Sequence, residues 1–338
     1  MKRFGNGLKI VIGLIISAGF LYLAFRKLDF AEMIKAFSSA NYWLLLPVVM
    51  IIFVSHWLRS IRWKLLLNPI QKISLSNLYS ALLIGYAANT VLPAHLGEFF
   101  RAYVIGRKRE ISVSSVLATI VVERIIDVLS IVLIMAVTFV IYPFPDWVKK
   151  SGYIMLAFAI GMFVFLVMMK LYSAATMNFI HLILKPFPQK LRERVDSLSR
   201  SFLDGLKPME NKFDYITIVV LSLLIWFCYW AVFYLNFYTF NLVAEFNLNT
   251  TSSLVLLVIT TISIVVPSSP GYVGTYHWLC QVSLGLFHVP RAIALTYAIV
   301  VHAINFFPVS IVGFILAWIE GIELSTRNVG QDGTVSDN

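Results

Sequence analysis

The chain has 338 residues, of which 59% are hydrophobic and only 13% are charged, and its formal net charge is +10. Soluble domains carry roughly 25% charged residues, so this composition excludes an ordinary soluble globular domain. Long apolar stretches recur without the alternation of an outer-membrane barrel, which predicts an all-α polytopic integral membrane protein. The basic excess is typical of cytoplasmic loops, so we expect no nucleic-acid partner.

Six full spans are predicted in chain order. They cover about residues 8–25, 42–58, 112–140, 154–171, 215–240 and 292–318. The second span ends in a basic segment with Arg59, Arg62 and Lys64, which we place where the helix leaves the membrane.

Two further apolar segments are too short to span a membrane comfortably, because a span needs about 20 apolar residues. The first covers residues 78–91 and the second covers residues 254–266, and a short helix follows each of them. Five residues mark the breaks: Asn89, Pro93, Gly97, Pro267 and Pro270. We therefore predict two re-entrant or broken helical hairpins.

The two breaks indicate an inverted repeat, because three full spans separate them and a long helix with polar groups follows each one. We predict a single transmembrane domain over residues 1–325, with halves at about 8–171 and 213–318. A cytoplasmic amphipathic segment over residues 172–212 joins the halves, and residues 326–338 form a disordered tail.

The distribution of basic residues predicts the orientation. With both termini in the cytoplasm, about three quarters of the 27 Lys and Arg residues fall on the cytoplasmic side. This bias is what the positive-inside rule requires. If both broken segments crossed the membrane fully, the basic loop around Arg192 would lie outside, against the rule.

Five ionisable residues lie within or beside apolar sequence near the first break: Glu98, Arg101, Glu123, Arg124 and Asp127. A charge in hydrocarbon costs roughly 2.5–3.5 kcal/mol even on insertion scales, so such groups must pair or line a polar cavity. Two alternatives stay open. The group is either a structural ion network, or a site where Arg101 or Arg124 binds a lipid phosphate and the acids hold it or accept a cationic headgroup.

The second break and the helix after it add six candidate substrate-binding residues: Ser268, Ser269, Gly271, Gly274, His302 and Asn305. The Ser and Gly residues are typical of a helix N-terminus that binds an anion, or of close helix packing. His302 and Asn305 lie three positions apart, on one face of the predicted last helix. Two alternatives stay open for them, a packing role or a role in proton coupling.

We predict no catalytic residue, metal or cofactor. The sequence contains no Asp-x-Asp, His-Glu-x-x-His or P-loop motif. The histidines show no metal-ligand spacing, and Cys228 and Cys280 are expected to be packing residues. The aromatic residues of the span at 215–240 are expected to face lipid rather than a headgroup.

The combined motifs resemble the lysylphosphatidylglycerol synthase transmembrane-region family. They are Asn89, Pro93, Gly97, Glu98 and Arg101, then Glu123, Arg124 and Asp127, then residues 267–274. That family includes the flippase portion of the bacterial multiple peptide resistance factor, hopanoid-transport proteins and the membrane part of archaeal dolichol-phosphate glycosylation proteins. The resemblance covers about residues 8–318 and implies a flippase-like fold. No room is left for a soluble aminoacyl-transfer domain, so lipid synthesis is not implied.

We therefore expect a flippase that moves a phospho-, aminoacyl- or glycolipid between leaflets of the bacterial cytoplasmic (inner) membrane, rather than an enzyme. The alternative is a membrane subunit or enzyme of lipid-linked glycosylation or lipid modification. The expected substrate is a membrane lipid, and the candidate partner is a lipid synthase or glycosyltransferase. The sequence assigns neither the lipid nor an oligomeric state.

Overall fold

The structure is a computed structural model that describes residues 18–26, 28–91, 96–185, 188–207, 209, 211–264 and 270–322. All secondary structure in these ranges is helical. Five of the described helices are long and apolar enough to cross a membrane: Tyr42–Leu67, Val113–Ile141, Asp146–Leu171, Lys212–Thr239 and Arg291–Ile319. The all-α polytopic prediction is confirmed. Most of the predicted first span and the predicted tail lie outside the described residues.

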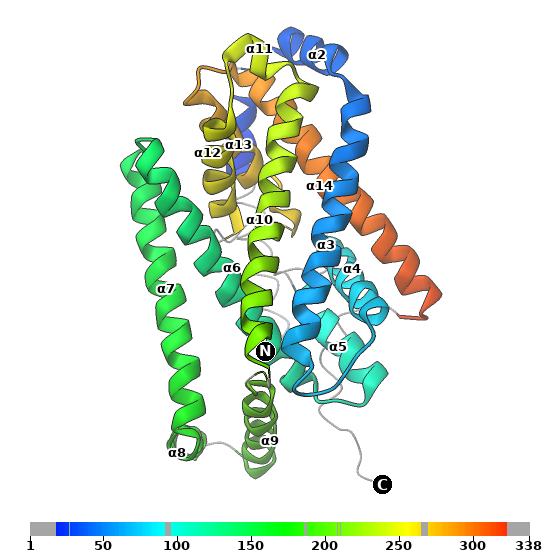
Figure 1. Ribbon diagram of the computed structural model, residues 1–338, viewed down its shortest axis with the longest axis vertical. Helices are drawn as coiled ribbons and strands as arrows, with labels where there is room; N and C mark the ends of the chain where they lie inside the picture. The colour runs from blue at the N-terminus through cyan, green and yellow to red at the C-terminus, as the bar shows by residue number, and fades with distance from the viewer. Residues whose placement is uncertain are drawn as a thin grey trace.

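The helices follow one another in a fixed order (Figure 1). The first half contains α2 (Phe30–Ser39), α3 (Leu45–Leu67), α4 (Leu75–Val91), α5 (Gly97–Arg109), α6 (Val113–Ile141) and α7 (Asp146–Leu171). Then come α8 (Ser173–Leu184), α9 (Gln189–Gly205), α10 (Lys212–Thr239), α11 (Leu242–Phe246), α12 (Thr250–Thr261), α13 (Thr275–Gly285) and α14 (Arg291–Ile319). Three short 3-10 turns are η1 (Tyr42–Leu44), η3 (Ile262–Ile264) and η4 (Pro270–Tyr272).

Local sequence signals set several helix ends. Asn249 accepts from the backbone N–H of Ser252, and the Ser252 hydroxyl accepts from the N–H of Asn249, so this capping box begins α12. Pro290 directly precedes α14, where a fixed φ suits the first turn. Glu110, in the left-handed region with φ 54°, ends α5.

Both predicted breaks divide a helix into two short pieces. Helix α4 ends at Val91 and α5 begins at Gly97, while α12 ends at Thr261 and α13 begins at Thr275. Pro93 and Pro267 fall outside the described residues, and the Pro270 backbone begins η4. None of these four helices has the roughly 20 residues that a span requires.

The two halves contact each other in a reciprocal way. Helix α4 of the first half packs on α14 of the second, and α12 packs on α6. Within the halves α5 packs on α6 and α13 on α14, while α3 pairs with α10 across the molecule. Figure 1 places α4 and α5 toward one end of the long axis and α12 and α13 toward the other. These contacts pair helices of the two predicted halves, and the inverted repeat itself stays a prediction.

The basic segment after the second predicted span was placed wrongly. Helix α3 continues to Leu67, and the side chains of Arg59 and Arg62 are buried within the protein. The helix continues because Trp63 and Leu67 enter a hydrophobic core with α4 and α5. The guanidinium groups on the same helix pair with carboxylates of α6, as described below.

The predicted amphipathic segment between the halves forms two helices, α8 and α9, rather than one. Helix α9 is held against the first turns of α6, because Ser114 Oγ donates to the Leu198 carbonyl at 2.7 Å and Ser115 Oγ donates to the Ser201 carbonyl at 2.6 Å. Helix α7 begins at Asp146, eight residues before its predicted start, directly after Pro145.

Candidate functional site

The charged residues around the first break form a buried ion network centred on α6. The Glu123 side chain is fully buried. Its Oε1 lies 2.7 Å from Arg59 Nη2, and its Oε2 lies 2.9 Å from Arg101 Nη2. Nη2 atoms of Arg62 and Arg124 lie 3.4 and 3.3 Å from Oε1. One carboxylate is thus shared among four guanidinium groups.

Asp127 extends the network one helical turn along α6. Its Oδ1 lies 2.6 Å from Arg62 Nη2, and its Oδ2 lies 3.3 Å from Arg124 Nη1. Arg124 Nε lies 3.0 Å from Glu98 Oε1, which links α6 to α5. The Arg124 and Glu98 side chains are 37% and 35% exposed, so this pair forms the accessible end of the network.

The network carries an excess of positive charge. Its members are Arg59, Arg62, Glu98, Arg101, Glu123, Arg124 and Asp127. Four arginines against three carboxylates leave a formal charge of +1. The buried Nε and Nη1 atoms of Arg101 have no hydrogen-bond partner among the residues that the structure describes. A buried cationic donor without a partner is costly, so these N–H groups favour an added acceptor.

Close backbone contact between α4 and α5 holds this half of the site. The Asn89 side-chain oxygen accepts from the Gly97 backbone N–H at 2.7 Å and so satisfies a free N–H at the start of α5. A methyl group on Gly97 would overlap the Gly85 carbonyl oxygen, and one on Gly85 would lie 2.8 Å from the Gly97 oxygen. Glycine at both positions therefore allows the two helices to cross at backbone contact.

A cavity of about 640 Å³ lies between the two broken elements. This volume falls within the roughly 300–1,000 Å³ range of small-molecule sites. Its charged lining residues are Arg59, Glu98, Arg101 and Arg124. Its uncharged polar lining includes Asn89, Thr260, Thr261, Ser263, Asn305 and Ser310. Its aromatic lining includes Tyr86, Phe99, Trp226, Tyr229, Phe233, Tyr272, Tyr276 and Phe306.

The second broken element contributes a neutral wall with two histidines. His302 Nε2 lies 2.7 Å from the Gly271 carbonyl oxygen, so Nε2 carries the proton of this hydrogen bond. The Gly274 N–H donates to His277 Nδ1 at 3.3 Å, and the two imidazole centroids are 4.9 Å apart. Gly271 has φ +71°, a backbone conformation that glycine adopts without strain.

The structure gathers most of the predicted site residues around one cavity. Lining it are Asn89, Gly97, Glu98, Arg101, Arg124, Gly271, His302 and Asn305. Two predicted residues, Glu123 and Asp127, lie behind this wall in the ion network. Gly274 precedes α13 and is absent from the lining, while Ser268 and Ser269 lie outside the described residues. The Asn305 amide donates to the Val301 carbonyl of its own helix.

Sequence reasoning missed two arginines of the site, Arg59 and Arg62, and the two tyrosines that Arg59 contacts. Arg59 Nη1 donates to the hydroxyls of Tyr86, at 2.6 Å, and Tyr229, at 3.2 Å. Arg62 Nη1 donates to Ser222 at 2.9 Å. The available signal was the three-residue spacing of the two arginines, which places both on one face of α3.

The expectation that the α10 aromatic residues face lipid was only partly right. Phe227 is 59% exposed, but Trp226 and Phe233 are buried and line the cavity with Tyr229. Within the described residues, no group of three His, Cys, Asp or Glu side chains has the arrangement of a metal site. The described lining of the cavity offers guanidinium, carboxylate, amide, hydroxyl, imidazole and aromatic groups.

Comparison with known proteins gives partial and full-length relatives. The glycosyltransferase AglD of Haloferax volcanii is 32% identical over 130 residues, which cover 38% of this chain and 21% of AglD. The chain thus spans about a fifth of AglD's length. A UPF0104 membrane protein of Methanocaldococcus jannaschii is 23% identical over 94% of this chain and 97% of its own length. Another, from Methanothermobacter thermautotrophicus, is 22% identical over 93% and 94%.

No solved structure matches the chain. The profile of the family described as "Lysylphosphatidylglycerol synthase TM region" matches residues 10–313, which include α2 to α13, most of α14 and every described cavity residue. This multi-pass membrane protein therefore belongs to the lysylphosphatidylglycerol synthase transmembrane-region family.

Proposed function

We propose that the protein is a lipid transporter that binds a phosphate-bearing headgroup in the cavity between its two broken elements and moves it between leaflets. The single observation that carries this proposal is the unpartnered pair of Arg101 donors in a network of formal charge +1. A phosphate offers several acceptor oxygens, and a planar guanidinium binds two of them at once.

The rest of the lining suits a lipid headgroup. Trp226 and Tyr276 also line the cavity, and within the described ranges the indole N–H of Trp226 and the hydroxyl of Tyr276 lack hydrogen-bond partners. These groups supply further donors for phosphate or sugar oxygens. A polar headgroup crossing hydrocarbon alone meets a large desolvation cost, which a cavity with such donors lowers.

We place this single domain in the bacterial cytoplasmic membrane with both termini in the cytoplasm. Arg59, Arg62 and Arg101 belong to the buried network rather than to a loop, which lowers the predicted cytoplasmic count by three. The basic residues around α8 and α9 still give that side a clear excess.

A second candidate is a role in lipid-linked glycosylation, because the first relative is a glycosyltransferase by name. Under this alternative the cavity binds a glycosylated polyprenyl phosphate, and the protein acts as a membrane subunit beside a glycosyltransferase or lipid synthase. The phosphate would again meet Arg101, so the two candidates differ in the headgroup beyond it.

The test is a leaflet-translocation assay in liposomes with fluorescent phosphatidylglycerol and a membrane-impermeant quencher. Arg101→Lys keeps a cation beside Glu123 but removes the unpartnered donors, and loss of a charge-assisted hydrogen bond predicts a rate at least about tenfold lower. Arg109→Lys, at an exposed position of the same helix, serves as the matched control and keeps the wild-type rate. Equal rates in the two variants would contradict the proposal. Transport of a glycosylated polyprenyl phosphate alone would favour the second candidate.

A further inference from the structure

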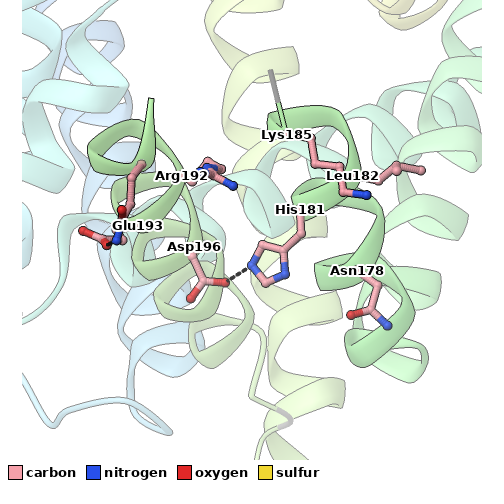
Figure 2. A pocket seen from close by; sticks show the side chains of 8 residues that line it. Asn178, His181, Leu182, Lys185, Arg192, Glu193 and Asp196 are labelled. Atoms are coloured by element: carbon pink, nitrogen blue, oxygen red, sulfur yellow. Dashed lines mark hydrogen bonds and ion pairs between the residues drawn. The ribbon is translucent and has the colours of Figure 1, made fainter. Parts of the chain in front are cut away.

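A second polar hollow lies outside the cavity, between α8 and α9 (Figure 2). Its volume is about 550 Å³. Helix α8 lines it with residues spaced by three and four positions, among them Asn178, His181 and Lys185, and α9 does the same with Gln189, Arg192 and Asp196. One face of each helix is therefore turned toward the other, and the space between them is lined almost entirely by polar side chains.

The carboxylates of this groove already have partners. Asp196 Oδ1 lies 2.7 Å from His181 Nε2, as Figure 2 shows, and Asp196 Oδ2 accepts from Arg200 Nε at 2.9 Å. The hydrogen bond from Arg200 lowers the pKa of Asp196, and His181 acts in the same direction. Glu193 accepts from Gln189 Nε2 at 2.7 Å. Asp196 is thus paired within the helix pair, and Glu193 is hydrogen-bonded to a neutral amide of its own helix.

The two cations of the groove are not engaged. The Lys185 and Arg192 side chains form no hydrogen bond or ion pair with the described part of the chain, and the Arg192 Nε atom is buried. Figure 2 shows Arg192 on α9 directed toward α8, and Lys185 just beyond the end of α8 on the other side of the groove. The N–H groups that lack a partner in the described part of the groove are cationic donors, so the ligand they favour is an anionic acceptor.

The position of the helix pair indicates where that anion comes from. Helix α8 starts two residues after the spanning helix α7 ends at Leu171, and α9 lies beside it at the same end of the molecule (Figure 1). The Phe179, Leu182 and Ile183 side chains of α8 are 62%, 59% and 53% exposed. Large exposed apolar residues beside a basic groove are typical of a helix that lies at the lipid headgroups.

We propose that the groove between α8 and α9 binds the headgroup phosphate of an anionic phospholipid, with Lys185 and Arg192 as its ligands. The site shares no residue with the central cavity and does not depend on transport. It holds a lipid of the surrounding leaflet at the protein surface.

The experiment is native mass spectrometry of the full chain released from mild detergent, titrated with phosphatidylglycerol or with zwitterionic phosphatidylcholine. The test variant combines Lys185→Gln with Arg192→Gln. At about 1 kcal/mol for each cation near an anionic headgroup, its phosphatidylglycerol affinity falls about thirtyfold. The control combines Arg194→Gln with Lys207→Gln, which removes the same charge from exposed positions outside the groove. The control affinity changes by less than about threefold.

Four outcomes would overturn the proposal. Equal losses in the two double variants would mean that general surface charge, and not the groove, attracts the lipid. Unchanged affinity in the groove variant, or equal binding of phosphatidylcholine, would exclude a site for the anionic headgroup. Displacement of the lipid by low millimolar inorganic phosphate would assign the groove to a free anion. Because none of the four substituted side chains forms an ion pair with any residue in the described ranges, unchanged thermal unfolding is expected and serves as the folding check.

Discussion

The two broken elements are both built from two short helices, but the side chains that they place at the cavity differ in charge. Around α5 and α6, the cavity wall is held by ion pairs between arginines and carboxylates. Around η4, α13 and α14, the equivalent wall is neutral, and a hydrogen bond from His302 to the Gly271 carbonyl closes it. Among the described residues that line the cavity, none from α12, η4 or α14 carries a formal charge.

The two sides of the cavity therefore differ in formal charge. Under the proposed function, a headgroup phosphate would bind on the side of the first half, and the hydroxyl, amide and aromatic groups of the second half would face the remainder of the lipid. The two helix breaks are similar in sequence, but all arginines among the described cavity residues come from α3, α5 and α6. Three substitutions test the comparison, and they follow from the largest expected effect to the smallest.

Glu123→Gln is expected to be the most damaging single change. Its carboxylate pairs with four guanidinium groups and is fully buried, so its loss leaves uncompensated cations. Breaking a buried ion pair costs about 3–5 kcal/mol. The unfolding midpoint in detergent should drop sharply, while Glu245→Gln, at an exposed position, leaves it unchanged. A stable Glu123→Gln protein would show that the first half does not depend on this charge.

Gly97→Ala tests the backbone contact that brings α5 to the cavity. The new methyl group meets the Gly85 oxygen and the Asn89 side chain, and neither can withdraw without parting the helices. Overpacking of this kind costs about 1–3 kcal/mol. Gly161→Ala on α7, where no atom lies within 4 Å of the added methyl, is the control and should not lower the unfolding midpoint. Equal midpoints in the two variants would refute a tight crossing.

His302→Phe should lower the unfolding midpoint least of the three substitutions. The contact that it removes lies entirely within the second half. It removes the donor to the Gly271 carbonyl, and one such hydrogen bond is worth about 1 kcal/mol. His302→Gln retains a side-chain N–H donor and should recover part of the loss in thermal unfolding. If His302→Phe destabilises the protein as much as Glu123→Gln does, the two walls are not energetically different.

The sequence was informative about the breaks and the charged residues of α5 and α6. Their spacing of three and four positions predicts that Glu123, Arg124 and Asp127 lie close together on one helix. Because charged groups in apolar surroundings need partners, the sequence also predicts that they form ion pairs. Arg59 and Arg62 were interpreted as loop residues because their partners lie 64 and 65 positions away along the chain. Only tertiary packing of α3 against α6 reveals that contact.

The interior face of α10 was hidden for a similar reason. Its aromatic residues surround the whole helix, so composition does not separate the lipid-facing Phe227 from the cavity-lining Trp226 and Phe233. The groove between α8 and α9 also required the structure, because a single amphipathic pattern does not show that two helices turn their polar faces together.

The most direct test of the central claim is the lipid content of the protein purified in mild detergent. Wild type and Arg109→Lys should retain the same phosphate-bearing lipid, and Arg101→Lys should lose at least about nine tenths of it while keeping its unfolding midpoint. That result would assign the headgroup to the Arg101 donors. Equal amounts and kinds of bound lipid in all three proteins would contradict the account and leave the arginines of the first half with a structural role alone.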